Sequence, residues 1–281
     1  MQHTFETQGS ERLSQFLAHC GISRGLTSLL KRTDGGIMVN GVPAHTDYIL
    51  SPGDTVQINE QPEYTDIIIP KDLGVKILYE DNEVIVYDKP NDMPCHPSRE
   101  HHDDTLANHH AFYTGGMVFH CITRLDRDTT SCCLVAKSRY AANFLKNNVV
   151  KKYSVIASGL MESSHGVIEK PIRRKPGSLI ERECADDGKY AKTSFTISLI
   201  NARYTFCSCT TETGRTHQIR VHFASIGYPL AGDSLYGGDM HDLSHQALHC
   251  ERIRFITPDD GFTVIVESEQ PKEWRKLYHY G

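Results

Sequence analysis

The spacing of apolar residues divides the chain into a short helical start and a longer, strand-rich remainder. Apolar side chains recur every three or four positions across residues 13–20 and again across 26–30, which predicts two short helices. They alternate with polar side chains across 37–39 and 56–58, which predicts strands, and Asn40-Gly41 is a tight-turn sequence. The first sixty residues are therefore predicted to form a small αα-β module.

Beyond residue 75, short apolar runs and alternating runs favour strands. A polar stretch at 91–116, rich in His, Asp and Gly, predicts a loop with one helix, and Pro62 and Pro70 mark a linker before it. The predicted strands cover residues 84–87, 132–136, 153–157, 193–199, 204–208 and 264–266, and the predicted helices cover 140–149, 219–226 and the segment around Trp274.

These elements predict the fold class. Strands outnumber helices and connect mostly between sequence neighbours, so we predict an α+β fold with a mixed, largely antiparallel central sheet and flanking helices. The predicted organisation is a module at residues 1–62, a linker at 63–74 and a main domain at 75–281.

Composition adds little to this picture. The 281 residues include 39% hydrophobic and 23% charged side chains and carry a formal charge of −5, as in an ordinary globular protein. No apolar run approaches the roughly 18–20 residues that a membrane span requires. Met1–Ser10 lacks the basic start and apolar core of a signal peptide, so we expect a cytoplasmic protein. The negative charge does not exclude an RNA partner, because phosphate binding depends on local basic patches.

Cysteine and histidine are frequent but show no recognisable pattern. The nine cysteines are odd in number and form no Cys-x-x-Cys spacing. The histidines are scattered, apart from the pairs His101-His102 and His109-His110. We therefore predict reduced, partly buried thiols and solvated imidazoles, with no metal site.

Asp126 has an unusual sequence environment. It lies between Arg124 and Arg127, just before a predicted strand. Nearby positive charge keeps an aspartate ionised even when water is partly excluded, which suits a nucleophile or a base. A structural salt bridge at the end of a loop fits this segment equally well.

Two further segments carry chemical signals. Tyr153 opens a predicted strand, where its ring can stack on a planar ligand, although a half-buried core tyrosine is the commoner alternative. The run 213–222 places Arg215, His217 and Arg220 at the start of a predicted amphipathic helix. A helix N-terminus with two arginines suits phosphate or carboxylate binding, and packing alone does not explain so many polar residues there.

From about residue 75 onward, the chain resembles the RluA family of pseudouridine synthases. The matching motifs are Lys89-Pro90 with His96-Pro97, the segment 124–137, the run 214–222, the Gly-Tyr-Pro-Leu-Ala-Gly-Asp run at 227–233, and Gln246-Ala247-Leu248-His249. The resemblance implies a pseudouridine synthase fold and the isomerisation of uridine in structured RNA without a cofactor or a metal ion. Because the glycosidic bond of a stacked base is out of reach, the target uridine is expected to flip out.

The resemblance also assigns roles to matching residues. Asp126 is the essential carboxylate, which attacks the ribose or removes a ribose proton, and Arg220 pairs with it. Tyr153 packs against the target base and assists loss of the proton from its carbon. Arg124 fills the gap that the flipped uridine leaves in the RNA stack. Further contacts with RNA or with the local backbone are expected from Arg215 and His217.

The first module resembles the RNA-binding domain shared with ribosomal protein S-four. The matching segments are Arg12-Leu13, Ser23-Arg24, Val39-Asn40-Gly41 and Gly53-Asp54. A packing module with ordinary turns is the alternative. If the resemblance holds, the RNA contacts of this module are expected from Arg12, Ser23, Arg24, Lys31 and Asn40.

The chain departs from the family pattern near the predicted catalytic residue. Thr129-Thr130-Ser131 stands where Thr-Ser-Gly is usual, Thr123 stands where histidine is common, and Asn91 stands where glycine follows Lys-Pro. Ser131 in place of glycine is expected to shift the backbone behind the catalytic loop.

Two other classes of protein compete with this interpretation. A non-catalytic RNA-binding or ribosome-assembly protein would keep the fold and use only the N-terminal module. A metal or cysteine hydrolase would need ligands or a nucleophile at defined spacing, which the sequence does not show. We expect a monomer that acts on structured RNA and binds neither DNA nor membrane. Ribosomal RNA is the favoured substrate, and transfer RNA is the alternative.

Overall fold

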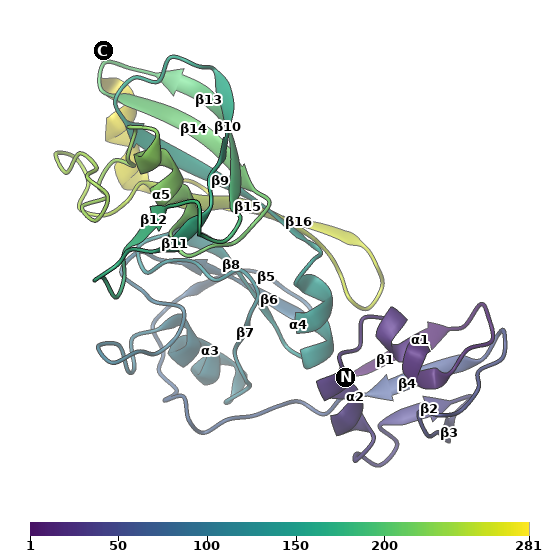
Figure 1. Ribbon diagram of the computed structural model, residues 1–281. Helices are drawn as coiled ribbons and strands as arrows, with labels where there is room; N and C mark the ends of the chain where they lie inside the picture. The colour runs from purple at the N-terminus through teal and green to yellow at the C-terminus, as the bar shows by residue number, and fades with distance from the viewer. Residues whose placement is uncertain (281) are drawn as a thin grey trace.

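Strands dominate the computed structural model, which describes residues 1–280 (Figure 1). They form a four-stranded N-terminal sheet, a ten-stranded sheet and a separate two-stranded hairpin. Among the described residues, β8 (Thr130–Ala136) and β15 (Leu248–Ile256) make the one parallel pair, and all other pairs are antiparallel. The predicted α+β class with a largely antiparallel sheet is confirmed.

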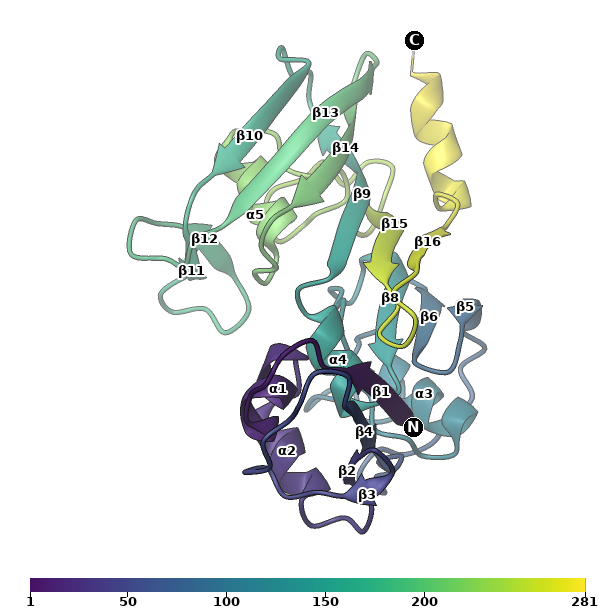
Figure 2. The same cartoon turned by 90° about the vertical axis from the view of Figure 1, so that its right-hand side faces the viewer.

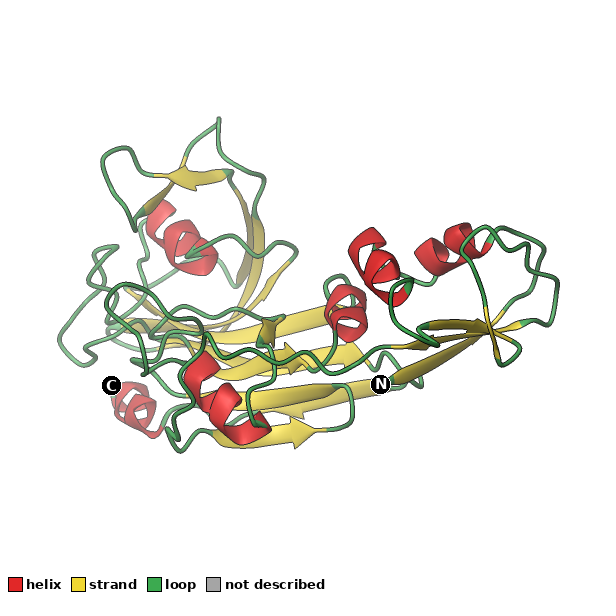
Figure 3. Ribbon diagram, turned by 90° about the horizontal axis from the view of Figure 1, so that it is seen from below, coloured by secondary structure: helices red, strands yellow, loops and turns green. Residues whose placement is uncertain are grey.

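The N-terminal sheet has the strand order β1-β4-β2-β3, and α1 and α2 lie on one side of it (Figure 3). The predicted helices and strands of this module are confirmed. The first strand was missed, because Phe5 is its one apolar residue. In chain order the elements are β1 (Gln2–Glu6), α1 (Leu13–His19), α2 (Arg24–Leu30), β2 (Ile37–Val39), β3 (Val42–Pro43) and β4 (Thr55–Asn59).

This module docks on the rest of the chain through α4 (Arg139–Leu145) (Figure 2). The Glu60 carboxylate accepts hydrogen bonds from the backbone N–H groups of Arg139 and Tyr140, at 2.8 and 3.1 Å. Those groups have no partner inside the helix, so a carboxylate from the N-terminal module caps a helix of the main domain. The Tyr140 ring packs on His3, with ring centroids 4.2 Å apart, and joins the apolar core of the N-terminal module.

The ten-stranded sheet follows the order β10-β13-β14-β9-β15-β8-β6-β5, with β16 beside β15 and β7 beside β8. The main apolar core is built on its central strands. Besides β8 and β15, its strands are β5 (Lys76–Glu80), β6 (Val84–Lys89), β7 (His120–Cys121), β9 (Val149–Ser158), β10 (His165–Glu169), β13 (Lys192–Ile200), β14 (Tyr204–Thr211) and β16 (Thr263–Glu267), and the separate hairpin joins β11 (Ile172–Arg174) to β12 (Arg182–Cys184).

All six strands predicted in this domain are confirmed, and β15 is the most important of those missed. Its pairing with β9 shifts register between His249 and Arg252, so its apolar residues do not follow the alternation that reveals a strand. The helix predicted at 140–149 ends at Leu145, and Val149 begins β9 instead. Asparagines at 147 and 148 favour the turn between them.

The remaining helices flank the sheet (Figure 2). They are α3 (Leu106–Thr114), α5 (Gln218–Ser225) and the 3₁₀ helix η1 (Lys272–His279), which confirms the helix predicted around Trp274. His109 and His110 in α3 are buried, so the expectation that they are solvated is wrong. The His110 ring instead forms a 3.0 Å hydrogen bond with the Tyr87 hydroxyl of β6.

Within the described chain, every helix falls short of the length and apolar character that a membrane span requires.

Candidate active site

A pocket of about 500 Å³ opens where the loop before β8, the start of β9 and the loop before α5 meet. Its volume lies within the range typical of sites for small molecules, so a single nucleotide can enter it. Five of the residues predicted to act on RNA or in catalysis line its wall: Arg124, Asp126, Tyr153, Arg215 and His217. The fold therefore brings together side chains that lie up to 93 positions apart in the sequence.

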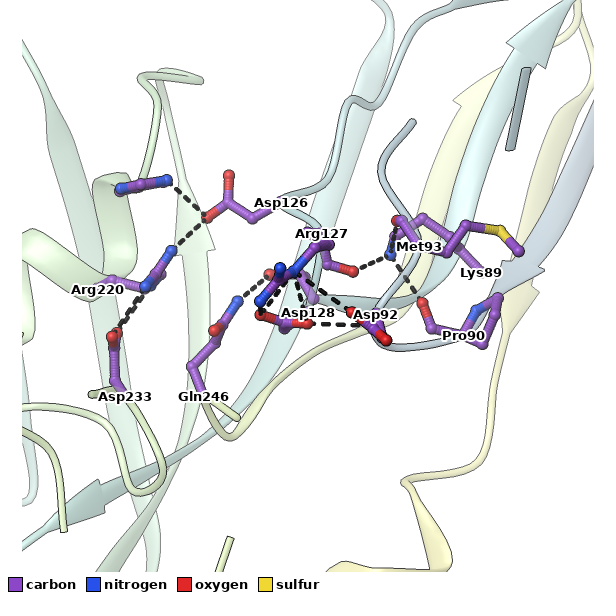
Figure 4. A network of polar contacts seen from close by, with 12 residues as sticks. Lys89, Pro90, Asp92, Met93, Asp126, Arg127, Asp128, Arg220, Asp233 and Gln246 are labelled. Atoms are coloured by element: carbon purple, nitrogen blue, oxygen red, sulfur yellow. Dashed lines mark hydrogen bonds and ion pairs between the residues drawn. The ribbon is translucent and has the colours of Figure 1, made fainter. Parts of the chain in front are cut away.

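Lys89, at the end of β6, holds the loop that carries Asp126. Its side chain is buried, and its ammonium group donates hydrogen bonds to the carbonyl oxygens of Pro90, Met93 and Arg127 at 2.8, 2.8 and 2.7 Å (Figure 4). Burial lowers the pKa of Lys89, and three acceptors satisfy its three N–H donors. Because Arg127 directly follows Asp126, this contact ties the loop that carries Asp126 to the sheet.

Ser131 follows the same loop and occupies a backbone conformation that favours glycine. Its φ angle is +78°, and its side chain is fully buried. A serine in this left-handed conformation costs about 1 kcal/mol relative to glycine. The shift of the backbone relative to a family member with glycine stays a prediction.

Asp126 is held by Arg220 of α5, which is itself held by a second carboxylate. Arg220 contacts Asp233 through two short bonds, Nε–Oδ2 at 2.7 Å and Nη2–Oδ1 at 2.8 Å, and reaches Oδ2 of Asp126 through Nη1 at 3.4 Å (Figure 4). The Asp233 side chain is fully buried, whereas that of Asp126 is 24% exposed. Asp233 thus fixes the guanidinium, and Asp126 keeps an oxygen available to the pocket.

The predicted pair of flanking arginines does not form around Asp126. The Arg127 guanidinium contacts Asp128 at 3.1 Å and Asp92 at 3.6 Å instead. Arg124 is exposed and lines the pocket. The positive group in contact with Asp126 is Arg220, from a segment 94 positions later.

His217 is the second group near the Asp126 carboxylate. It precedes α5 with a left-handed φ of +56°, which places its ring between Asp126 and Tyr236. Its Nδ1 lies 2.8 Å from the Tyr236 hydroxyl, and its Nε2 lies 4.0 Å from Oδ2 of Asp126. Burial lowers the pKa of His217, so the ring is neutral at neutral pH; it forms a hydrogen bond with Tyr236, whereas the Asp126 carboxylate lies beyond hydrogen-bond distance.

Tyr153 presents a largely buried ring to the pocket. Burial raises the pKa of its hydroxyl well above the usual value, and the charge of Asp126 adds to this effect. The phenol is therefore neutral in the free protein. It can stack on a base or donate a hydrogen bond, and it must lose its own proton before it can accept another.

Gln218 organises the loop before α5. Its side-chain oxygen accepts hydrogen bonds from the Thr213 hydroxyl at 2.7 Å and from the Arg215 backbone at 3.0 Å, and its amide donates to Lys192 and Thr193. The Arg215 side chain is exposed and donates to the Tyr190 carbonyl. Its guanidinium is therefore presented at the pocket rim.

The predicted contacts of the N-terminal module divide into two kinds. Ser23 caps α2 by accepting a hydrogen bond from the Leu26 backbone at 3.2 Å. Asn40 has a φ of +51° and forms hydrogen bonds with Asp54 and with the Thr55 backbone, so its side chain stabilises a turn. The basic residues Arg12, Arg24 and Lys31 are all exposed, and in the sequence they lie far from the residues that line the pocket.

Next to the pocket lies a feature that the sequence did not predict. The thiols of Cys95, Cys121 and Cys133 come within 4.8 Å of one another beside the segment that leads into Asp126, and Cys121 lines the pocket. The prediction of no metal site rested on short Cys spacings, and these residues are 26 and 12 positions apart. No spacing rule would have found them.

Lys89, Asp233 and Gln218 lie within motifs of the sequence, but the sequence alone gives none of them a role. A lysine after an apolar run and an aspartate after a glycine are visible signals. Their partners, however, are carbonyl and guanidinium groups from other segments, and only the folded chain identifies those.

Comparison with known proteins gives a consistent result. Residues 83–225 match the family model described as RNA pseudouridylate synthase. An uncharacterized RNA pseudouridine synthase of Bacillus subtilis is 36% identical over 275 residues, which cover 94% of this chain and 97% of that relative. A ribosomal large subunit pseudouridine synthase D of Xanthomonas campestris is 30% identical over 266 residues, which cover 86% and 80%.

A solved structure agrees in fold. Human RNA pseudouridylate synthase domain containing 1 matches 70% of this chain and 84% of its own, with a TM-score of 0.60 and 24% identity.

Proposed function

This chain belongs to the RNA pseudouridylate synthase family, and from that premise we propose that it isomerises specific uridines in large-subunit ribosomal RNA. The observation that carries the proposal is the half-buried Asp126 carboxylate, which lies in a nucleotide-sized pocket and is held by a buried Arg220–Asp233 pair. An ionised carboxylate fixed in this way suits attack on a carbon or removal of a proton.

The reaction breaks one bond and forms another within the same nucleotide. The bond from the ribose to the uracil nitrogen breaks, the uracil turns, and its carbon five bonds to the ribose. Carbon five then loses its proton, and the freed ring nitrogen gains one. We propose that Asp126 acts on the ribose and that Arg220 keeps its carboxylate ionised. No external electron donor or acceptor is needed, because reactant and product are isomers.

Tyr153 is proposed to hold the flipped base. Its largely buried ring faces the pocket, and a neutral phenol can pack on uracil without an unpaired charge. Its hydroxyl is a candidate to receive the carbon-five proton, with its own proton passing to water. Arg124, exposed at the rim, is proposed to enter the RNA stack where the uridine was.

A neighbouring hollow supports an RNA path that leads away from the active-site pocket. It has a volume of about 440 Å³ and shares Gly214, Arg215 and Thr216 with the pocket. Cationic side chains suit phosphate oxygens on both sides of a flipped nucleotide. The basic residues that line this hollow are Arg173, Arg174, Arg182, Lys189 and Arg215.

The N-terminal module, at residues 1–62, is proposed to be a second RNA contact. Its exposed Arg12, Arg24 and Lys31 supply positive charge, whereas Ser23 and Asn40 shape the helix start and the turn. The Glu60 cap on α4 joins this module to the main domain at 75–281, across the linker at 63–74. We further propose a cytoplasmic monomer that acts on RNA rather than DNA.

The choice of ribosomal RNA rests on relatives whose names state that substrate, such as the enzyme of Xanthomonas campestris.

The test is tritium release from RNA transcripts that carry uridine labelled at carbon five. Formation of the carbon–carbon bond expels that hydrogen, so release counts turnovers directly. We expect release from large-subunit ribosomal RNA and none from a pool of transfer RNA transcripts.

Two results would overturn the proposal in different ways. Release from transfer RNA alone would reject the ribosomal substrate. Release from neither RNA would favour a non-catalytic RNA-binding protein. The modified uridine is then mapped in the ribosomal transcript by chemical labelling of pseudouridine and primer extension.

A further inference from the structure

Three cysteine thiols from separate segments meet behind the catalytic loop. Cys95 lies in the loop before α3, Cys121 ends β7, and Cys133 lies within β8. Their sulfur atoms all lie within 4.8 Å of one another, and those of Cys121 and Cys133 are 3.7 Å apart. Within residues 1–280, no other group of three Cys, His, Asp or Glu side chains brings its ligand atoms this close.

We propose that this cysteine cluster binds a thiophilic d¹⁰ metal ion of the Zn²⁺ and Cd²⁺ class. A Zn–S bond of about 2.3 Å places three sulfur ligands roughly 3.8–4.0 Å apart. The Cys121–Cys133 separation already matches this value, and the remaining separations need to shorten by at most about 1 Å. Thiolates select soft cations of this kind over Mg²⁺ or Ca²⁺.

The position of the cluster gives the ion access and charge balance. Cys121 is half-buried and lines the active-site pocket, so an ion can enter from solvent and a water molecule can complete its coordination. Three thiols release three protons to solvent as three metal–sulfur bonds form, without oxidation or reduction. The product carries one net negative charge, and the buried Lys89 ammonium lies close enough for its charge to act on Cys95.

Metal binding reaches the catalytic loop through two hydrogen bonds. The Cys95 thiol donates to the Leu125 carbonyl at 3.3 Å, and the Cys133 thiol donates to the Thr123 carbonyl at 3.4 Å. Both carbonyls belong to the segment that leads into Asp126. A bound ion takes the place of both thiol protons, so these two hydrogen bonds are lost, while the Lys89 contact with the Arg127 carbonyl remains. Metal binding is therefore expected to loosen the segment before Asp126 and to slow turnover.

The experiment titrates metal-free, full-length protein with Zn²⁺ against a coloured competing chelator, with no RNA present. Cd²⁺ is then added to separate samples, because thiolate-to-metal charge transfer gives an ultraviolet absorption band. Cys121→Ser and Cys95→Ser each remove one ligand. Cys132→Ser is the matched control. Cys132 is as buried in β8 as its neighbour Cys133, but its thiol contacts the Val266 carbonyl at 3.8 Å.

We expect one tightly bound Zn²⁺ ion per chain in the wild type and in Cys132→Ser. In Cys121→Ser and Cys95→Ser the affinity for Zn²⁺ should be at least about 100-fold weaker. A second readout needs no variant. One equivalent of Zn²⁺ should slow alkylation of Cys121 by about 10-fold or more and leave that of the equally half-buried Cys184 unchanged.

Any of three results would overturn the proposal. The wild type binds no Zn²⁺ tightly, the affinity for Zn²⁺ is unchanged in Cys121→Ser and Cys95→Ser, or Zn²⁺ leaves the alkylation of Cys121 unchanged. The cluster would then be three small buried side chains that pack the wall. Since no RNA is used, none of these results bears on the proposed ribosomal substrate. The effect on turnover is scored separately, as the ratio of each protein's tritium release with and without Zn²⁺. We expect this ratio to fall in the wild type but not in Cys121→Ser, and an unchanged wild-type ratio would reject the effect on the loop.

Discussion

Asp233 is predicted to matter for catalysis although it does not line the pocket. Asp233→Asn keeps the shape of the side chain and removes its charge. The substitution leaves the Arg220 guanidinium, whose side chain is 8% exposed, without the carboxylate that makes its two shortest contacts, at 2.7 and 2.8 Å. The remaining contact, to Asp126, is 3.4 Å long.

The magnitude follows from burial. Removing one partner of a buried ion pair costs about 3–5 kcal/mol, because the other charge stays buried and unpaired. That is a large part of the roughly 5–15 kcal/mol by which a typical domain is stable. A guanidinium that moves by about 1 Å no longer positions Asp126, which corresponds to a loss of about 100-fold in kcat.

The assay combines urea unfolding with tritium release, measured at a temperature where circular dichroism shows that the wild type and Asp233→Asn are both folded. Asp239→Asn is the matched control, because Asp239 contacts Arg203 at 2.7 Å with both side chains about one-third exposed. A surface pair of this kind contributes less than about 1 kcal/mol. The reasoning fails if Asp233→Asn unfolds at the wild-type urea concentration, or if it is stable and retains wild-type kcat.

Three further outcomes are expected. Lys89→Met removes the donor to three carbonyl oxygens and is expected to lower the free energy of unfolding, measured by urea titration, by about 3 kcal/mol or more. An unchanged midpoint of urea unfolding would show that other contacts hold the loop. Tyr153→Phe keeps the ring that packs on the base and lowers kcat with little change in KM; a raised KM alone would assign the hydroxyl to binding. Burial, aided by the charge of Asp259, raises the pKa of Glu83 to about 7. The stability that its protonated form contributes is therefore complete below pH 4.5 and is lost as pH rises through 7. Glu83→Gln therefore raises Tm at pH 8 but not at pH 5, and equal shifts at both values would contradict the assignment.

Several parts of the fold and of the site could be predicted from the chain because they depend on local pattern. Alternating or continuous apolar runs identify β6, β8 and β14, and a glycine after an apolar helical stretch identifies the ends of α1 and α5. The polar run before α5 marked a functional loop, because a packed helix start has no need of so many donors and acceptors.

Other contacts could not be predicted, because they join groups that are distant in sequence. Arg127 is next to Asp126 in the chain but points to Asp92 and Asp128, because the chain turns here, with the Thr129 backbone N–H bonded to the Asp126 carbonyl. Glu60 caps a helix eighty positions later, and the cysteine cluster joins a loop to two strands. None of these contacts leaves a periodic signal in the sequence.

Tritium release by Asp126→Asn, measured beside the wild type on the same large-subunit ribosomal RNA transcript, tests the central claim most directly. Asparagine fits the same space and can neither attack the ribose nor remove a proton. The account predicts release from the wild type and a rate at least about 1000-fold lower from Asp126→Asn, with unchanged RNA binding and an unchanged unfolding midpoint. Release at a comparable rate from both proteins would contradict the assignment of Asp126 as the catalytic carboxylate.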